Sequence, residues 1–212
     1  KDSQFGAYWS VMKYNDIMHV ETNHQIYSSE ASLGGITIRD APPEFRRPMF
    51  IAMDQPKHGA QRKTVAPMFT PTHLDQLAHI IRQRAAQCLD ALPRNATFDW
   101  VDRVSIELTT QMLATLFDFP WEDRRKLTRW SDVATALPGN TEIIASEDAR
   151  QAELQECAAY FSKLWNERIN AEPKNDLISM MAHSEATRDM DPKTFLGNLI
   201  LLIVGGNDTT RN

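Results

Sequence analysis

The sequence predicts a mainly α-helical protein with one small β element near its N-terminus. Several long segments repeat apolar residues at the three- and four-residue spacing that places them on one face of a helix. Two helix starts are marked by a capping residue followed by proline, at Thr70-Pro71 and at Asp191-Pro192. Near the N-terminus, the stretch from Ala7 to Val11 is rich in residues that suit a strand.

The composition excludes some classes of protein. The 212 residues are 42% hydrophobic, which is enough for one or two domains with a sizeable core, and neither repeats nor disordered segments are evident. The formal net charge of −5, with basic residues scattered along the chain, argues against nucleic-acid binding. No signal peptide or transmembrane run is found, so we expect a soluble, cytoplasmic protein. Cys88 and Cys157 belong to no metal-binding or redox motif, and we expect reduced thiols.

The N-terminal region is predicted to hold the strand, one short helix and a long loop. Asn15 can cap the helix, whose apolar side includes Ile17 and Met18. The stretch from Ser28 to Arg47 contains the densest run of glycines and prolines and is predicted to be an irregular loop. Within it, Ile36 and Ile38 alternate with polar residues, which leaves a brief strand or a ligand-facing edge open.

A helix opening at Asp54 carries the first candidate binding residues. His58 and Arg62 are four residues apart and share a helical face. Together they can clamp the carboxylates of an acidic ligand, with Arg62 forming the stronger, bidentate contact. Because Lys57 and Lys63 also lie here, spacing alone favours a merely solvated basic face.

The middle of the chain is predicted to be a series of packing helices. They run from Pro71 to about Leu92, from Asp99 to Phe117, from Pro120 to about Leu137 and from Thr141 to Ala171, with a short helix at Asp176–Met181. The first is expected to be a core helix, with apolar positions at Leu74, Leu77, Ile80, Ile81, Ala85, Cys88 and Leu89. The charged run of the helix from Thr141 is most simply a solvated surface.

The C-terminal stretch from Phe195 to Asn212 is the most distinctive part of the sequence. Its apolar run is interrupted only by Gly197 and Asn198 up to Val204, which predicts a helix buried on most sides but too short for a membrane span. Gly205 and Gly206 weaken a helix but let a flat cofactor or small ligand approach its axis. Thr209, four residues after Gly205, can bond back to the Gly205 carbonyl. With Asp208 beside it, this is a plausible proton-delivery site, although a plain helix end fits equally well.

These motifs resemble those of the cytochrome P450 monooxygenases. The wording Gly205-Gly206-Asn207-Asp208-Thr209-Thr210 is similar to the oxygen-activating motif of the family's central helix, and the pattern Asp-x-Pro-x-His-x-x-x-Arg at 54–62 is similar to its haem-propionate helix. Lys57 stands where the family usually has an acid. The order of the predicted elements also follows the family, in which the helices from Pro120 and Thr141 form a mobile lid. The resemblance therefore implies the N-terminal half of the cytochrome P450 fold.

The resemblance assigns roles to individual residues. It implies haem b as the cofactor, with its propionates held by His58 and Arg62 and its distal side faced by Gly205 and Gly206. Thr209 is expected to hydrogen-bond the oxygen species and Asp208 to help bring in protons. Substrate-contacting residues implied in the apolar pocket are Leu201 and Val204.

The resemblance also shows what the sequence does not contain. The family's Glu-x-x-Arg pair and haem-ligating cysteine loop lie beyond Asn212, and neither Cys88 nor Cys157 has that loop's surroundings. Residues 1–212 are accordingly expected to form a single incomplete domain that ends within the oxygen-activating helix. Because the chain begins at Lys1 without methionine, we expect a piece of a longer polypeptide.

Two segments indicate a subgroup within the family. Residues 201–212 and the stretch Gln61–Pro67 look most similar to the bacterial terminal alkane and fatty-acid hydroxylases. That resemblance implies hydroxylation of a terminal carbon. The acidic sequence without a membrane run resembles the bacterial members of the family, which implies electrons from a ferredoxin and its reductase. The competing interpretations are a non-catalytic helical ligand-binding protein and an inactive fragment.

Overall fold

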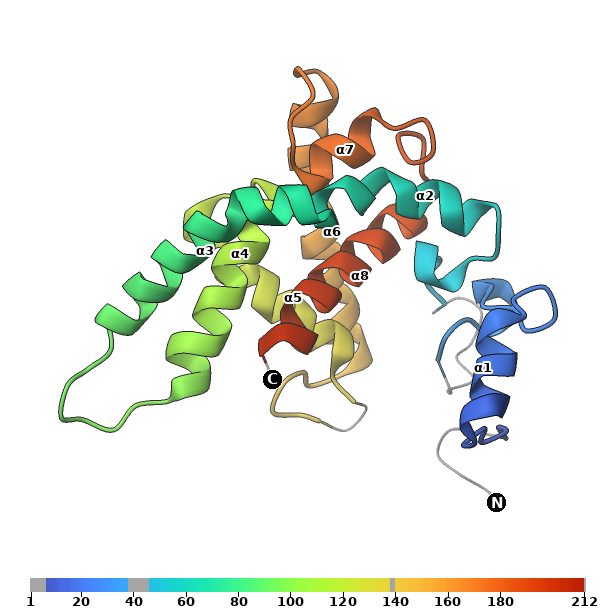
Figure 1. Ribbon diagram of the computed structural model, residues 1–212, viewed down its shortest axis with the longest axis horizontal. Coiled ribbons are helices and arrows are strands. Elements are labelled where there is room, and N and C mark those ends of the chain that lie inside the picture. Colours follow the sequence, from blue (N-terminus) through green and yellow to red (C-terminus); the bar gives the residue numbers. More distant parts are fainter. Residues whose placement is uncertain (1–6, 38–45, 138–139, 212) are drawn as a thin grey trace. The chain divides into compact units, whose positions relative to one another are not determined.

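The structure, a computed structural model, describes residues 7–37, 46–137 and 140–211 (Figure 1). Its α-helices are α1 (Tyr14–Thr22), α2 (Lys57–Val65), α3 (Pro71–Asp90), α4 (Glu107–Phe117), α5 (Arg125–Thr135), α6 (Glu147–Ile169), α7 (Leu177–His183) and α8 (Pro192–Arg211). Short 3₁₀ turns occur at Ala31–Leu33, Phe50–Ala52, Ala66–Phe69 and Trp121–Asp123, and a π-helical turn, Val101–Ile106, leads into α4. The prediction of a mainly helical chain is confirmed.

The predicted strand is not confirmed. Residues 7–13 have no regular secondary structure, and no strand is found in the part of the chain that the structure describes. A strand needs a neighbour to pair with, and here the side chain of Trp9 is 96% exposed. Ile38 lies outside the described residues, and Ile36 belongs to a turn.

Capping side chains explain most helix starts. Thr70 Oγ1 accepts from the His73 amide at the start of α3, and Asp176 Oδ1 accepts from the Ser179 amide at the start of α7. Asp191 Oδ1 accepts from the amides of Lys193 and Thr194 at the start of α8. The caps at Thr70 and Asp191 were predicted from the sequence, whereas Asp176 was predicted only as part of a short helix. α1 differs, because Lys13 occupies its N-cap position and makes no side-chain cap bond, so the predicted cap at Asn15 is wrong.

The helix predicted from Thr141 begins later, at Glu147. Ser146 Oγ accepts a hydrogen bond from the Ala149 amide at 3.1 Å, and Ser146 is extended, so the helix cannot continue towards Thr141. α3 also differs from expectation. Of its residues only Leu77 and Cys88 are buried, while Leu74, Ile81 and Leu89 are exposed.

The chain forms two compact units. The first comprises Lys1–Arg62 and Met190–Asn198, and the second comprises Lys63–Asp189 and Leu199–Asn212. The prediction of a single domain stays a prediction. In the first unit, Asp54 accepts hydrogen bonds from the Ser28 hydroxyl and the Ser29 amide, which ties the residues before α2 to the loop after α1. α1 itself has no buried residue.

The second unit has an aromatic core. α3 packs against α4, α4 against α5, α5 against α6 and α6 against α7 (Figure 1). The core rings lie in contact at centroid distances of 4.9 to 6.2 Å and belong to Phe117, Phe119, Trp130, Tyr160 and Phe161. From α8, Leu199 and Ile203 are fully buried. Burial of this apolar surface is the main stabilising term of the unit.

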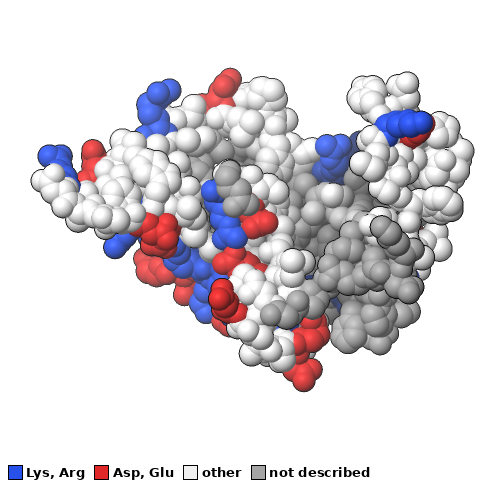
Figure 2. Space-filling model, turned by 90° about the horizontal axis from the view of Figure 1, so that it is seen from below, with Lys and Arg blue, Asp and Glu red and all other residues white. Residues whose placement is uncertain are grey.

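The surface carries charged side chains of both signs. On the face seen in Figure 2, acidic and basic side chains are intermixed. No helix within the described residues combines the length and hydropathy required to cross a bilayer.

Cys88 and Cys157 are free and buried, and burial raises the pKa of both thiols.

Candidate functional site

His58 is oriented by a backbone carbonyl within the first unit. Its Nδ1 atom lies 2.7 Å from the carbonyl oxygen of Phe50, and the two rings meet edge to face. Because a carbonyl can only accept, Nδ1 carries the proton of this bond. Among the described residues none forms a hydrogen bond with the other ring nitrogen, Nε2, which is left for a ligand.

Arg62 follows one turn later on α2, at the i+4 position that shares a face with His58. Its side chain is exposed, and within the described part of the chain no residue makes a hydrogen bond or ion pair with it. An arginine fork with no internal acceptor is suited to bind a carboxylate in a bidentate way. Both predicted residues therefore leave polar side-chain atoms without a partner among the described residues, and their role as anion-binding groups stays a prediction.

The glycine pair on α8 has two distinct surroundings in the second unit. A Cβ atom added to Gly206 would lie 2.7 Å from Leu113 Cδ1, so this glycine permits close packing of α8 on α4. A Cβ added to Gly205 would meet nothing within 4 Å among the chain's own atoms, and Gly205 is exposed. Gly205 therefore faces open space, where it leaves room for a ligand.

Thr209 lies on the same face of α8 as Gly205. Its hydroxyl donates to the Gly205 carbonyl at 2.8 Å, as the four-residue spacing predicts. Leu201 is one turn before Gly205 on this face, and Leu201 and Val204 are both only partly buried, in contrast to Ile203. This face of α8 therefore combines an apolar wall, a glycine gap and a hydroxyl.

Asp208 is held by an ion pair that the sequence analysis missed. Arg211 Nη2 donates to Asp208 Oδ1 at 2.8 Å and to Asp132 Oδ1 of α5 at 2.5 Å. Burial alone would lower the pKa of Arg211, but the hydrogen bonds and charges of Asp132 and Asp208 outweigh it and raise that pKa. The i, i+3 spacing of Asp208 and Arg211 could have predicted the first contact, but nothing in the sequence indicates Asp132.

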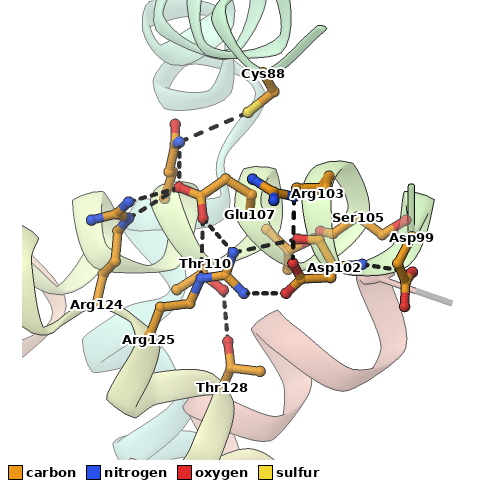
Figure 3. Close-up of polar contacts among 12 residues, drawn as sticks. Cys88, Asp99, Asp102, Arg103, Ser105, Glu107, Thr110, Arg124, Arg125 and Thr128 are labelled. Carbon is orange, nitrogen blue, oxygen red and sulfur yellow. Dashed lines mark hydrogen bonds and ion pairs between the residues drawn. The ribbon is translucent and has the colours of Figure 1, made fainter. Parts of the chain in front are cut away.

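A second polar cluster lies elsewhere in this unit and centres on Glu107 (Figure 3). Glu107 Oε1 accepts from Arg124 Nη2 at 2.9 Å and from Gln111 Nε2 at 2.7 Å, while its Oε2 accepts from Arg125 Nη2 at 2.7 Å. Nearby, the hydroxyls of Thr110 and Thr128 are 2.7 Å apart. These contacts fasten the start of α5 to α4, and every member of the Glu107 ion cluster has an internal partner, which indicates a structural role.

The described residues form a helical protein in which α2 carries Arg62 and an unbonded His58 Nε2 atom, and α8 carries an exposed glycine beside partly buried apolar side chains. No family model matches the chain. It is similar over its whole length to two solved structures, cytochrome P450-153 from Novosphingobium aromaticivorans, at 52% identity and a TM-score of 0.88, and CYP153D17 from Sphingomonas sp. PAMC 26605, at 54% identity and 0.84. It covers 53% of each of those chains. A steroid C26-monooxygenase of Mycolicibacterium smegmatis is 30% identical over 97% of this chain and 48% of the relative.

The chain belongs to the cytochrome P450 family. It spans about half the length of the relatives that it matches. Haem is the cofactor of this family, and the residues of the chain fit it in two respects. First, the Arg62 side chain and the His58 Nε2 atom have no hydrogen-bond partner among the described residues, so both can bind an external carboxylate. Second, the Cβ position of Gly205 is open, as a flat cofactor requires.

Proposed function

We propose that this chain is part of a haem-thiolate monooxygenase that hydroxylates an unactivated C–H bond of an apolar substrate. The substrate we propose is a medium-chain alkane or fatty acid attacked at its terminal carbon, with O2 as oxidant and with electrons supplied by a ferredoxin and its reductase in the cytoplasm. The terminal position rests on the resemblance of residues 201–212 and 61–67 to the bacterial terminal hydroxylases, and the electron donor rests on the resemblance to the bacterial members of the family.

The observation that carries the proposal is the arrangement on α8. Gly205 is open, Thr209 is bonded to the Gly205 carbonyl at 2.8 Å, and Asp208 stands beside Thr209 in an ion pair with Arg211. Packing of α8 on α4 explains Gly206 but not the exposed Gly205, which costs about 0.8–1.0 kcal/mol relative to alanine. A helix that must admit a ligand close to its backbone needs glycine at such a position.

Each residue has a definite task in this proposal. Arg62 and the Nε2 atom of His58 would hold the haem propionates, while Gly205 would leave room for the ring. The bound haem would supply the reductive activation of dioxygen, for which a cysteine thiolate ligand is required. Thr209 would hold its hydroxyl beside Gly205, next to the space left for the cofactor, and Asp208 would pass protons from solvent towards that hydroxyl.

The substrate side of the proposal depends on apolar side chains. Leu201 and Val204 are partly buried and would present hydrocarbon to the substrate. An apolar wall offers no hydrogen bond to a polar substrate, so it favours a hydrocarbon chain. Selection of a terminal carbon over weaker internal C–H bonds would require that the pocket present only the chain end.

The direct test is the absorption spectrum of the purified protein, reduced and exposed to carbon monoxide, together with its intact mass. A strongly red-shifted Soret band with a mass well above 24.2 kDa, followed by terminal hydroxylation of an alkane with a ferredoxin system, is the expected result. A haem-free protein that binds alkanes without turnover would overturn the proposal in favour of a ligand-binding role.

A further inference from the structure

Gly197 and Asn198 are the residues that interrupt the apolar run of α8, and the proposed chemistry leaves them unexplained. Both lie in the first unit. A Cβ added to Gly197 would lie 2.0 Å from the carbonyl oxygen of Pro48, so only glycine allows the backbone before α2 to approach α8 this closely. Position 197 therefore marks a tight contact between two backbones.

Asn198, the next residue of α8, binds the backbone amide of Phe50. Its side chain is 1% exposed, and its Oδ1 atom accepts from the Phe50 amide at 2.8 Å. Its Nδ2 atom donates to Gln61 Oε1 on α2, also at 2.8 Å. A backbone amide can only donate, so the Phe50 contact fixes which side-chain atom of Asn198 is the oxygen and leaves Nδ2 to face Gln61.

The same Phe50 residue carries the contact onward to His58. Its amide is held by Asn198, and its carbonyl accepts the Nδ1 proton of His58 at 2.7 Å. Hydrogen bonds that follow one another in this way position each successive group. Asn198 thus contacts α2 at Gln61 directly and reaches His58 through Phe50.

We infer that Gly197 and Asn198 are positioning residues for His58. They fix Phe50, and Phe50 fixes the imidazole with its proton on Nδ1 and its Nε2 atom unbonded within the described chain. The significance of this arrangement for haem rests on the proposed function, since Nε2 is the atom that would meet a propionate. With Nδ1 already donating, Nε2 can donate to a carboxylate only in the doubly protonated ring, so carboxylate binding selects the cationic form of His58.

The tautomer of His58 can be measured on the chain without any ligand. Selective ¹⁵N labelling of the six histidines, with His58 assigned by a His58→Gln variant, should show a neutral His58 ring protonated on Nδ1. The Phe50 amide should exchange slowly with solvent. A neutral His58 protonated on Nε2 would overturn the inference without the need for any folded variant.

Variants of Asn198 separate positioning from packing. Asn198→Leu should abolish the Nδ1 preference and speed exchange of the Phe50 amide about tenfold, the effect of one lost hydrogen bond. Asn198→Asp keeps an oxygen for the Phe50 amide, and the Gln61 amide can turn to donate to it, so this variant should keep the tautomer. Gln61→Met removes only the α2 contact and serves as the matched control. An unchanged tautomer in folded Asn198→Leu would refute the positioning role.

Addition of iron-free protoporphyrin, compared with its dimethyl ester, tests the link to haem separately. The free acid should shift the ¹⁵N signal of His58 Nε2 in the wild type and do so at least several-fold less in Asn198→Leu, whereas the ester should not shift it. If the Nδ1 tautomer is found but neither porphyrin affects Nε2, the hydrogen-bond path stands and the proposed propionate role falls.

Discussion

Thr209 is the residue whose side chain distinguishes catalysis from helix structure most simply. It is exposed, and within the described residues its side chain bonds to the Gly205 carbonyl alone, so Thr209→Ala should change the free energy of unfolding by no more than about 0.5 kcal/mol. In the haem-loaded enzyme, the same change should leave haem content intact but lower the product formed per electron pair consumed. Thr210→Ala, an exposed neighbour, is the control. Equal coupling in both variants would remove Thr209 from the proposed chemistry.

The two glycines of α8 should respond differently to alanine. Gly205→Ala meets nothing within 4 Å and removes the helix cost of glycine, so it should stabilise this chain by about 0.8–1.0 kcal/mol. Gly206→Ala must displace the buried side chain of Leu113, and we expect it to gain less or to destabilise. Urea unfolding measures both. In the haem-loaded enzyme Gly205→Ala should instead be unfavourable, because its new methyl group occupies space that the cofactor would use.

At the scale of single residues, the sequence predicted which residues belong to the candidate site better than it predicted which residues they contact. His58, Arg62 and Thr209 stand where the motifs placed them on their helices, and the Thr209 contact with Gly205 was foreseen because it is local. Their tasks towards haem remain predictions. Phe50, Asn198 and Asp132 were missed because their contacts join segments that are distant in sequence, and no periodicity encodes such a pairing.

The elements are connected by charged clusters, of which the Glu107 cluster should be the most sensitive to acid. Burial alone would raise the pKa of Glu107, but hydrogen bonds from Gln111 and Arg124 and the charges of Arg124 and Arg125 hold that pKa below its ordinary value of 4.5. The folded state therefore prefers the ionised form. Glu107 therefore contributes its full stabilisation above pH 4.5, and this contribution is lost as the pH falls through the lower pKa that Glu107 has in the folded state.

Substitution of Glu107 tests this dependence. Glu107→Gln should lower the free energy of unfolding at pH 7, and its difference from the wild type should shrink as the pH falls below 4.5. Urea unfolding at several pH values gives both curves. The control is Glu142→Gln, at an exposed acid that has no side-chain partner among the described residues, and it should show no such convergence. A Glu107 difference that is independent of pH would mean that shape, and not charge, matters at this position.

Arg150 should be the most important cap between elements. From α6 it donates Nη2 to the Ala136 carbonyl at 2.8 Å and Nη1 to the Val133 carbonyl, so it satisfies the C-terminal end of α5. Arg150 is 9% exposed. Arg150→Met keeps the apolar stem but leaves these carbonyls without their donor, and we expect a loss of about 2–3 kcal/mol in unfolding free energy. Arg103→Met, at an exposed arginine, should cost little.

The sequence predicted which segments form helices, but it predicted the first and last residues of those helices only in part. The starts of α3, α7 and α8 were found because a capping side chain sits next to the apolar pattern. The start of α6 at Glu147 was missed because the predicted helix took in residues 141–146, where Ser146 is extended and caps from outside. The strand expected at residues 7–11 is absent from the described structure because strand-forming composition does not supply a pairing partner.

On the scale of the whole molecule, the two units should differ in stability. Among the described residues, buried apolar side chains are concentrated in the second unit, where Phe117, Phe161 and Leu164 belong to the core. The described part of the first unit buries few such side chains, and α1 buries none. Local opening costs least where little apolar surface is buried. The amides of α1 should therefore exchange much faster than those of α4 and α6.

The helix α8 makes this prediction sharp, because its first residues belong to one unit and its remainder to the other. If the units open independently, protection should change along a continuous helix, being lower at 195–198 than at 199–207. Phe161→Ala, which removes a fully buried ring and should cost about 3–5 kcal/mol, ought to reduce protection of residues 199–207 and leave 195–198 nearly unchanged. Hydrogen exchange followed by NMR measures each segment. An equal loss of protection along all of α8 would show that the chain unfolds as one cooperative body, as the single-domain prediction requires.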